Sequence, residues 1–506
     1  MKSNYIVAFV LSFAVLLGWD YFVVRPRKQA ARAAEVAATS PALPSAAPSA
    51  STSASAPAPV KKENLVVYEI GENRLSINRW GGAVAQWEIL ENGGWLTLVP
   101  RADLPQQGLA TFPDLEFDVQ RGGNTLTFTA MRPDGLRVEK TLTLSDNHRH
   151  ALSVNVRNAG KADITAEIAL GWGPGVEAGD EAGQKGGAAK GTQRAVVAEG
   201  DAVRRVKEGS VTGDFRWWAV DGHYFLAAFV PAVPDAATLH ISKNEAYFAV
   251  SRSQRETLRP GDTLGSSYTF YVGPKIYADL KATGLGLEKS VNFGTFAPLA
   301  RLIHTTLLTF HKLTKNFGWS IMLLTFIIQA LVLPLTISSF KHGQKMKAVQ
   351  PQMKRLQELY KNDARRLNVE MMELYKRHGL RFMGLEGCLP VFIQMPVFFA
   401  LYNALRSTYE LRHAPWIGWI KDLSLHDPFY VLPVLMGAGM FFQQKMSMAS
   451  VDPSQRQIMY IMPVMFTFFF LKMPAGLVLY WLTSSLLGIL VQTVLLKRHA
   501  AAAVRP

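Results

Sequence analysis

Amide, hydroxyl and indole side chains interrupt the apolar runs in the last third of the sequence. Their chemistry is hydrogen bonding, because no nucleophile, general base or metal ligand set accompanies them. A polar group in hydrocarbon costs several kcal/mol when it is left unpaired. These side chains therefore either form hydrogen bonds between neighbouring helices or line a hydrated groove. Their large number favours the groove. The set comprises Thr325, Gln329, Gln394, Tyr480, Trp481, Ser484 and Ser485.

Spacing places several of these side chains on common helix faces. Thr325 and Gln329 are four residues apart, so they lie one turn from each other on a helix. Trp481, Ser484 and Ser485 fall on one stripe of the last apolar run. The elements that must position them are membrane-spanning helices of about 20 residues. Five such spans are predicted at 319–340, 387–406, 429–446, 458–472 and 475–496.

A basic segment, 341–386, separates the first two of these spans. Its eleven Lys and Arg residues outnumber five Asp and Glu residues, and Lys354 and Arg355 are among them. Apolar side chains recur at helical spacing in both halves of the segment, which predicts two amphipathic helices packed as an antiparallel hairpin. Met353 lies in one arm, and Met371 and Tyr375 lie in the other. Methionine suits varied apolar partners as well as ordinary core filling, and both interpretations stay open.

The composition limits the class of partner. A net charge of +15 favours an anionic partner, and with apolar residues at 49% anionic lipid and ribosomal RNA are the best candidates. DNA is not expected, because no helix-turn-helix or zinc spacing is present. The single cysteine, Cys388, excludes an intramolecular disulfide and a cysteine-cluster metal site. We expect no cofactor and no metal.

The rest of the chain divides into segments of different composition. Residues 1–25 predict a signal-anchor helix, although cleavage stays open, and 26–60 form an Ala/Pro/Ser-rich linker. Short alternating runs separated by turn residues predict an antiparallel β-sandwich over 61–290. The pattern over 291–318 predicts an amphipathic helix in the membrane interface, and a position as a cap over the sandwich stays open as the alternative. The membrane core then covers 319–498, and 499–506 is the tail.

Charge predicts the orientation. The segment 341–386 is the most basic loop between spans, so it is expected in the cytoplasm. Successive spans cross the membrane in alternating directions. With six spans, both termini are then expected in the cytoplasm and the β-domain outside. Four basic residues directly after the first span would lie on the outer side in this orientation, against the rule that basic loops are cytoplasmic. They are Arg25, Arg27, Lys28 and Arg32. The orientation predicted from the longer basic segment, 341–386, is preferred.

Sequence motifs over about 290–498 resemble those of a known family. This part is similar to the YidC-type membrane protein insertase family, in the Gram-negative form with a large periplasmic domain. The N-terminal segments match the layout of the family rather than its motifs. The matching runs are Trp319-Ser320-Ile321, Thr325-Phe326-Ile327, Gln350-Pro351, Glu370-Met371-Met372, Leu374-Tyr375-Lys376, Gly387-Cys388-Leu389-Pro390, Ile393-Gln394-Met395-Pro396, Glu410-Leu411-Arg412, Asp422-Leu423-Ser424, Asp427-Pro428, Met462-Pro463 and Pro474-Ala475-Gly476-Leu477-Val478-Leu479-Tyr480.

The resemblance implies an energy-independent insertase and membrane chaperone of the bacterial inner membrane, not an enzyme. Five core helices would enclose a groove open to the cytoplasm and to lipid, and the periplasmic sandwich would be galactose-mutarotase-like without a sugar reaction. Thr325, Tyr480 and Trp481 match the slide positions, and Gln394 matches the groove lining. Nascent membrane protein segments, the Sec translocon with its accessory subunits, and the ribosome are the implied partners.

One position departs from the family pattern. The family usually has a basic residue, commonly Arg, where this sequence has Gln329. Gln329 can donate and accept hydrogen bonds but brings no net charge. The attraction of acidic client segments by a groove cation is therefore not carried over to this chain. We expect a wet groove with attraction supplied by the basic hairpin instead.

Two other classes of protein compete with this interpretation. A transporter or channel also needs polar residues inside the membrane, but it predicts repeats and interrupted helices, which the spans do not show. A tethered carbohydrate-acting enzyme predicts paired carboxylates at the mouth of the sandwich. No such cluster stands out in 61–290.

Overall fold

A computed structural model provides the structure of the chain. It describes residues 65–503 except 92, 100–107, 174, 177–192, 201, 207, 234–235, 243–247, 254, 380–384 and 448–452. The predicted anchor at 1–25 and linker at 26–60 lie outside the described residues, and so does most of the glycine-rich segment 171–191, for which the sequence predicts a surface loop.

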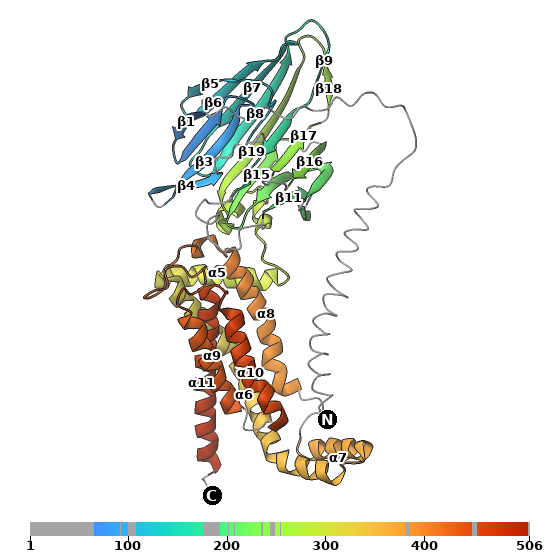
Figure 1. The fold of residues 1–506 in the computed structure, drawn as a ribbon, viewed down its shortest axis with the longest axis vertical. Helices are drawn as coiled ribbons and strands as arrows, with labels where there is room; N and C mark the ends of the chain where they lie inside the picture. Colours follow the sequence, from blue (N-terminus) through green and yellow to red (C-terminus); the bar gives the residue numbers. More distant parts are fainter. Residues whose placement is uncertain are drawn as a thin grey trace. The chain divides into compact units, whose positions relative to one another are not determined.

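The first half of the described chain is an antiparallel β-domain. Its largest sheet has nine strands in the order β12-β11-β14-β15-β19-β8-β7-β6-β5, and sheets of four, four and two strands accompany it (Figure 1). The strands are β1 (Leu65–Ile70), β2 (Asn73–Asn78), β3 (Ala83–Glu91), β4 (Gly94–Val99), β5 (Asp118–Gly122), β6 (Thr125–Met131), β7 (Leu136–Thr143), β8 (Arg149–Asn158), β9 (Ile164–Ala166), β10 (Ala169–Trp172), β11 (Arg194–Glu199), β12 (Ala202–Val206), β13 (Gly209–Asp214), β14 (Trp217–Asp221), β15 (Phe225–Pro231), β16 (Ala236–Ser242), β17 (Phe248–Arg252), β18 (Glu256–Leu258) and β19 (Thr263–Pro274).

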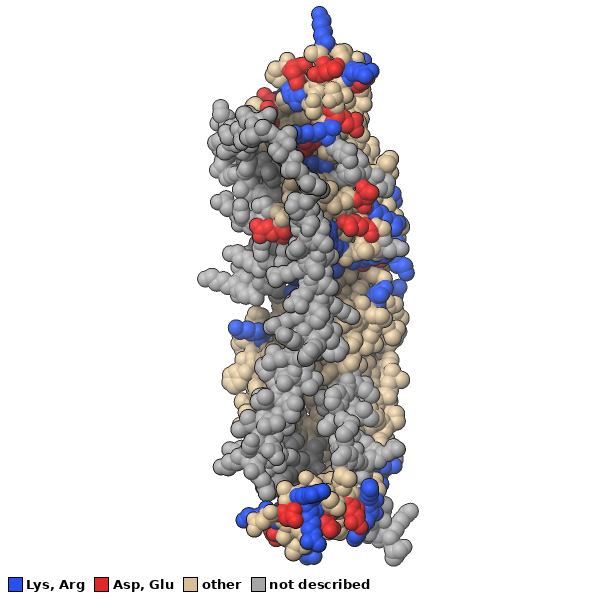
Figure 2. Space-filling view, turned by 90° about the vertical axis from the view of Figure 1, so that its right-hand side faces the viewer, with Lys and Arg blue, Asp and Glu red and all other residues tan. Residues whose placement is uncertain are grey.

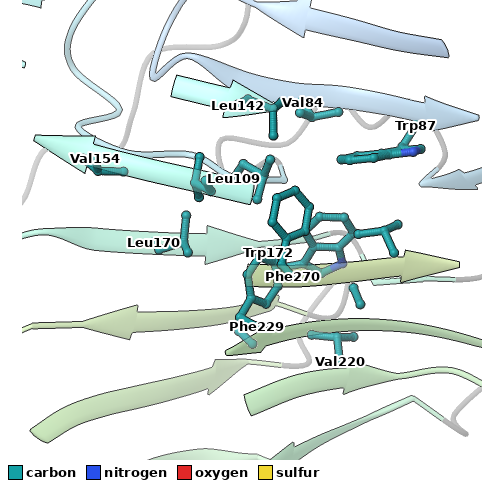
Figure 3. Close-up of a cluster of buried hydrophobic side chains, with 14 of the residues drawn as sticks. Val84, Trp87, Leu109, Leu142, Val154, Leu170, Trp172, Val220, Phe229 and Phe270 are labelled. Carbon is teal, nitrogen blue, oxygen red and sulfur yellow. The ribbon is translucent and has the colours of Figure 1, made fainter. Parts of the chain in front are cut away.

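Alternating side chains build the interior of the sandwich. In β8, every second residue is buried, as the period of a strand with one covered face requires. Aromatic side chains fill the space between the sheets, with Phe229 stacked on Phe270 at a centroid distance of 5.5 Å and tilted against Trp172 at 5.6 Å (Figure 3). The predicted β-sandwich is thus confirmed.

Three neighbouring strands of the large sheet, β11, β14 and β15, are covered on both faces. Every residue of β14 is buried, so Trp218 points into the sandwich while Trp217 points the other way. The cluster that contains Trp217 continues through Leu287 to Ile321 and Tyr480 of the helical part. A single apolar contact region therefore joins the β-domain to the helices.

The second half of the described chain is helical. α6, α8, α9, α10 and α11 pack against one another, and α5 packs on α6 and α8 (Figure 1). The helices are α4 (Tyr277–Ala282), α5 (Ala297–Thr314), α6 (Phe317–Leu359), α7 (Ala364–Arg377), α8 (Leu385–Ser407), α9 (Val431–Ser447), α10 (Pro453–Phe470) and α11 (Ala475–Ala503), with the short 3₁₀ turns η3 (Leu287–Ser290) and η4 (Tyr409–Leu411).

Several helices expose large apolar side chains, as lipid-facing surfaces do. Leu331 of α6 is 74% exposed and Phe468 of α10 is 69% exposed. Within the described residues, Phe317–Met346 and Ala475–Leu496 are long and apolar enough to cross a membrane, and Tyr460–Phe470 is a shorter apolar helix. α9 has only 17 residues, which is short of the about 20 that a perpendicular crossing takes. The helical membrane core is confirmed, whereas the count of six spans stays a prediction.

The first core span and the first hairpin arm form one continuous helix. α6 has 43 residues and passes Pro334 and Pro351 without ending. The sequence predicted a boundary near residue 340, but no turn residue stops the helix there. The turn lies instead at 360–363, where the Asp363 side chain caps α7 by accepting from the Arg366 amide at 3.0 Å.

A buried carboxylate organises the loop before α9. Asp427 is 0% exposed and accepts hydrogen bonds from Trp419 Nε1 at 3.0 Å, the Phe429 amide at 3.0 Å and the Leu432 amide at 2.7 Å. The Leu432 amide belongs to the first turn of α9 and Phe429 lies two residues before this helix, so Asp427 caps its start, where an acidic group is favourable. The same loop lies on α11, because the Gly476 amide donates to the Leu423 carbonyl at 2.9 Å.

Replacing Asp427 with Ala leaves three donors without this acceptor, and the Leu432 amide among them is buried. We expect Asp427→Ala to lower the free energy of unfolding by about 1–3 kcal/mol, measured by thermal unfolding of the purified full chain in detergent. Asp427→Asn keeps one carbonyl oxygen and should lose less. Equal stability of Asp427→Ala and the parent would show that these hydrogen bonds do not hold the loop.

Candidate functional site

The polar side chains of the membrane core meet on α11. This helix packs against α6, α8 and α9. Tyr480 and Ser484 are four residues apart, so they lie one turn from each other on the same face. Tyr480 is fully buried and Ser484 is half-buried. This face of α11 is therefore turned toward its neighbours and not toward lipid.

Two amides from two different helices reach this face. Gln329 of α6 donates from Nε2 to the Ser484 hydroxyl, and Gln394 of α8 donates from Nε2 to the Tyr480 hydroxyl. The two pairs lie one helical turn apart on α11 and join three helices. We call Gln329, Ser484, Gln394 and Tyr480 the polar stripe. All four were predicted as groove residues from the sequence.

Thr325 lies one turn from Gln329 on α6, but its hydroxyl is used within its own helix. It is 0% exposed and donates to the Ile321 carbonyl at 2.6 Å. This bond back to the preceding turn is common for threonine in membrane helices. Thr325 therefore adjoins the polar stripe without bonding across it, and its role in a groove stays a prediction.

Trp481 and Ser485 lie outside the polar stripe. The Trp481 ring packs against Phe398 of α8 and Phe470 of α10, each at a centroid distance of 5.3 Å. Ser485 is 3% exposed and packs against Gly439 of α9. Three successive sectors of α11 thus face three different surroundings: the amides, an aromatic cluster and a close helix contact.

Small residues of α9 were missed by the sequence reasoning. A Cβ atom on Gly437 would lie 2.0 Å from Thr467 Oγ1, so α10 approaches α9 more closely there than any larger residue would allow. Gly439, two residues later, is the contact for Ser485. The Gly-Ala-Gly run in this helix is the signal that could have predicted both contacts.

The basic hairpin consists of the end of α6 and all of α7. Val349 and Leu374 are its buried centre, with Met353, Leu356 and Tyr375 packed beside them. The Tyr375 hydroxyl lies 3.9 Å from the Met353 sulfur. The predicted packing of two amphipathic arms is thereby confirmed.

The hairpin exposes its charged side chains and part of its apolar ones. Lys354 and Arg355 are exposed, whereas Met371 is half-buried. Figure 2 shows Lys, Arg, Asp and Glu side chains gathered over the β-domain and over the hairpin, while the described surface of the membrane helices consists mainly of other residues. The hairpin thus offers cations beside thioether and aromatic surface.

The site has the means to bind polar groups by hydrogen bonding. Within the described residues, no group of three or more His, Cys, Asp or Glu side chains could hold a metal ion. The polar stripe provides amide and hydroxyl donors and acceptors without net charge. Fold and site together define a class: an integral membrane protein with a large β-sandwich domain and a hydrogen-bonding stripe inside its helical core.

Comparison with known proteins refines this class. Residues 309–502 match the family model described as 60Kd inner membrane protein, and residues 98–306 match the model of the YidC periplasmic domain. A membrane protein insertase YidC of Endomicrobium trichonymphae is 36% identical over 519 residues, which cover 99% of each chain. The insertase of the same name from Syntrophus aciditrophicus is 37% identical over 75% of this chain and 70% of its own.

This chain belongs to the YidC family of membrane protein insertases, and its β-domain is the periplasmic domain of that family. Among solved structures, an active YidC insertase covers 86% of this chain and 93% of its own with a TM-score of 0.41 and 18% identity. A galactose mutarotase-like protein from Lactobacillus casei covers 41% of this chain with a TM-score of 0.32 and 12% identity.

Proposed function

We propose that this insertase hands the polar part of a client segment from the cytoplasm into its membrane core by exchanging hydrogen bonds at the polar stripe. The observation that carries the proposal is the convergence of Gln329 and Gln394 on one face of α11. Both amides already have partners, so the resting helices bury no unpaired amide there. A client can then replace one partner of each pair.

The energy of such an exchange is small. Hydrogen bonds between membrane helices are worth about 0.6 kcal/mol on average and at most about 1.7 kcal/mol. The free energy lost when the Gln329–Ser484 hydrogen bond opens is therefore about equal to the free energy gained when a client forms one new hydrogen bond. A polar client group in bare hydrocarbon would find no hydrogen-bond partner to offset its loss of water. The polar stripe would lower the barrier for the polar segment without an energy source.

The hairpin is proposed as the receiving element. Its exposed Lys354 and Arg355 can attract acidic client segments and anionic headgroups, which compensates for the absence of a cation at Gln329. Its Met353, Met371 and Tyr375 offer adaptable apolar contacts to the client. The nascent chain, the Sec translocon and, through the same cations, the ribosome are the proposed partners. No bond-breaking reaction is part of this function.

The proposed topology follows the charge distribution. Six spans would place both termini and the hairpin in the cytoplasm and the β-domain in the periplasm of a bacterial inner membrane. The basic segment 341–386 supports this orientation. The galactose-mutarotase-like sandwich would serve as an extracytoplasmic domain without a sugar reaction.

Two substitutions at one position test the proposed exchange. Gln329→Leu removes the α6 donor, and we expect insertion of a model single-span protein into proteoliposomes to slow by about threefold to twentyfold, since one hydrogen bond of about 0.6–1.7 kcal/mol is lost. Gln329→Arg restores a donor and should insert at least as fast as the parent. If both variants behave like the parent, clients are not handled at this position.

A further inference from the structure

A cavity of about 170 Å³ lies where the β-domain meets the end of α8. Four strands or turns of the β-domain contribute to its wall, and the last turn of α8 closes it. The lining residues are Arg194, Arg205, Asp221, Gly222, His223, Lys275, Val291, Asn292, Asn403, Arg406 and Ser407. None of them belongs to the polar stripe or to the hairpin.

The charges around this cavity are not balanced. Four cationic side chains face one carboxylate, and that carboxylate is already used, because Lys275 Nζ lies 2.7 Å from Asp221 Oδ1. Within the described part of the chain, no carboxylate forms an ion pair with Arg194, Arg205 or Arg406. Three guanidinium groups thus share one small cavity with a single lining carboxylate, Asp221, which pairs with Lys275 and also attracts Arg205.

Two further observations support a positive potential in the cavity. The Arg205 Nη2 atom donates to the Ser290 carbonyl at 2.9 Å, whereas its Nε is buried without a hydrogen-bond partner. Burial, assisted by the nearby charges of Arg406 and Lys275, lowers the pKa of His223 to about 3, so this imidazole is neutral at physiological pH. Uncompensated cations at close distance are costly unless an anion joins them.

We propose that this cavity binds a phosphate group. Planar guanidinium forks match the oxygens of phosphate, and several of them can bind one phosphate at once. Arg406 lies at the end of α8, a helix that joins the membrane core, and helix ends of this kind lie at headgroup level. The phosphodiester of an anionic phospholipid is therefore the first source, and free inorganic phosphate is the second.

An occupied cavity would connect two parts of the protein. Arg194 and Arg205 come from β11 and β12, whereas Arg406 comes from α8. One anion held by all three would replace mutual repulsion with a shared counterion. The bound group would thus strengthen the attachment of the β-domain to the membrane core.

The test uses the purified full chain in a zwitterionic detergent, titrated with soluble dihexanoylphosphatidylglycerol and separately with inorganic phosphate. We expect at least one probe to bind and to raise the thermal unfolding temperature, as a ligand of the folded state must. Arg205→Gln and Arg406→Gln should each weaken binding at least tenfold. Tighter binding of the lipid identifies the headgroup as the source, and equal binding of inorganic phosphate identifies the free anion; both support the site.

Two control variants separate loss of the site from loss of the fold. Arg204→Gln removes the same charge from the same strand, but Arg204 is exposed on the opposite face and pairs with Glu199 at 3.2 Å, so binding should not change. Arg406→Lys keeps the charge and should bind more tightly than Arg406→Gln. Failure of the parent to bind either probe, or equal binding by Arg406→Gln and the parent, would overturn the proposal.

Discussion

A chain that carries Gln329→Leu, Gln394→Leu and Ser484→Ala together is expected to insert a model single-span protein at least about 30-fold more slowly than the parent. Each substitution removes one partner that a polar client segment would use, and each such bond is worth about 0.6–1.7 kcal/mol inside a membrane. The three losses amount to about 2–5 kcal/mol, and about 1.4 kcal/mol corresponds to a factor of ten in rate. The measurement is the insertion rate into proteoliposomes at equal protein content.

The matched control for this variant is Gln443→Leu. It makes the same chemical change on α9, where Gln443 lies against Gly488, one turn of α11 beyond Ser484, and belongs to neither the Gln329–Ser484 pair nor the Gln394–Tyr480 pair. We expect its insertion rate to stay within about threefold of the parent. Folding is checked by thermal unfolding, because Gln394→Leu leaves the buried Tyr480 hydroxyl without its partner and should lower the free energy of unfolding by about 1–3 kcal/mol, whereas the Gln329–Ser484 pair is replaced on both sides. A triple variant that is stable and fully active would refute a role for the stripe.

The β-domain is expected to become more stable by about 2 kcal/mol when the pH rises from 7 to 9. Lys140 is 0% exposed, and its Nζ donates to the carbonyls of Gly82 and Leu109, while no carboxylate of the described residues forms an ion pair with it. Burial lowers the pKa of Lys140 to about 7, whereas the unfolded side chain titrates near its ordinary value of about 10.4. Between these values the unfolded state binds more protons than the folded state.

The sign of this effect follows from the bound protons. Stability rises with pH by at most about 1.4 kcal/mol per unit in the window between the two pKa values, and it is independent of this group below pH 7. Urea unfolding of the full chain, followed by the β-sheet signal, measures it. Lys140→Met should abolish the slope, whereas the exposed Lys161→Met should keep it. An unchanged slope in Lys140→Met would assign it to another group.

Strands of the β-domain such as β8 could be predicted because one of their faces is buried. Leu152–Val156 lies within β8, and Tyr268–Val272 lies within β19, as their alternation indicated. The order of the nine strands could not be predicted, since β19 pairs with β8 across more than a hundred residues of sequence. The double-sided burial of β14 also depends on what packs below the sheet, which local patterns do not contain.

The polar stripe was predictable by residue type but not by pairing. Amides inside apolar runs stand out, so residue type alone predicts Gln329 and Gln394 as site residues. Their partners lie 155 and 86 residues away in the sequence, and no periodicity relates them. Thr325 shows the limit most clearly: its position one turn from Gln329 was correct, but its hydroxyl turned back to Ile321 instead of across the bundle.

Crosslinking to a stalled nascent membrane protein tests the central claim most directly. A photoreactive residue at Gln329 is compared with one at Leu331, which lies on the same helix but is 74% exposed on its lipid-facing side. The account predicts that the polar segment of the client crosslinks strongly from position 329 and at least several-fold less from position 331. Equal crosslinking from both positions, or none from 329, would contradict it.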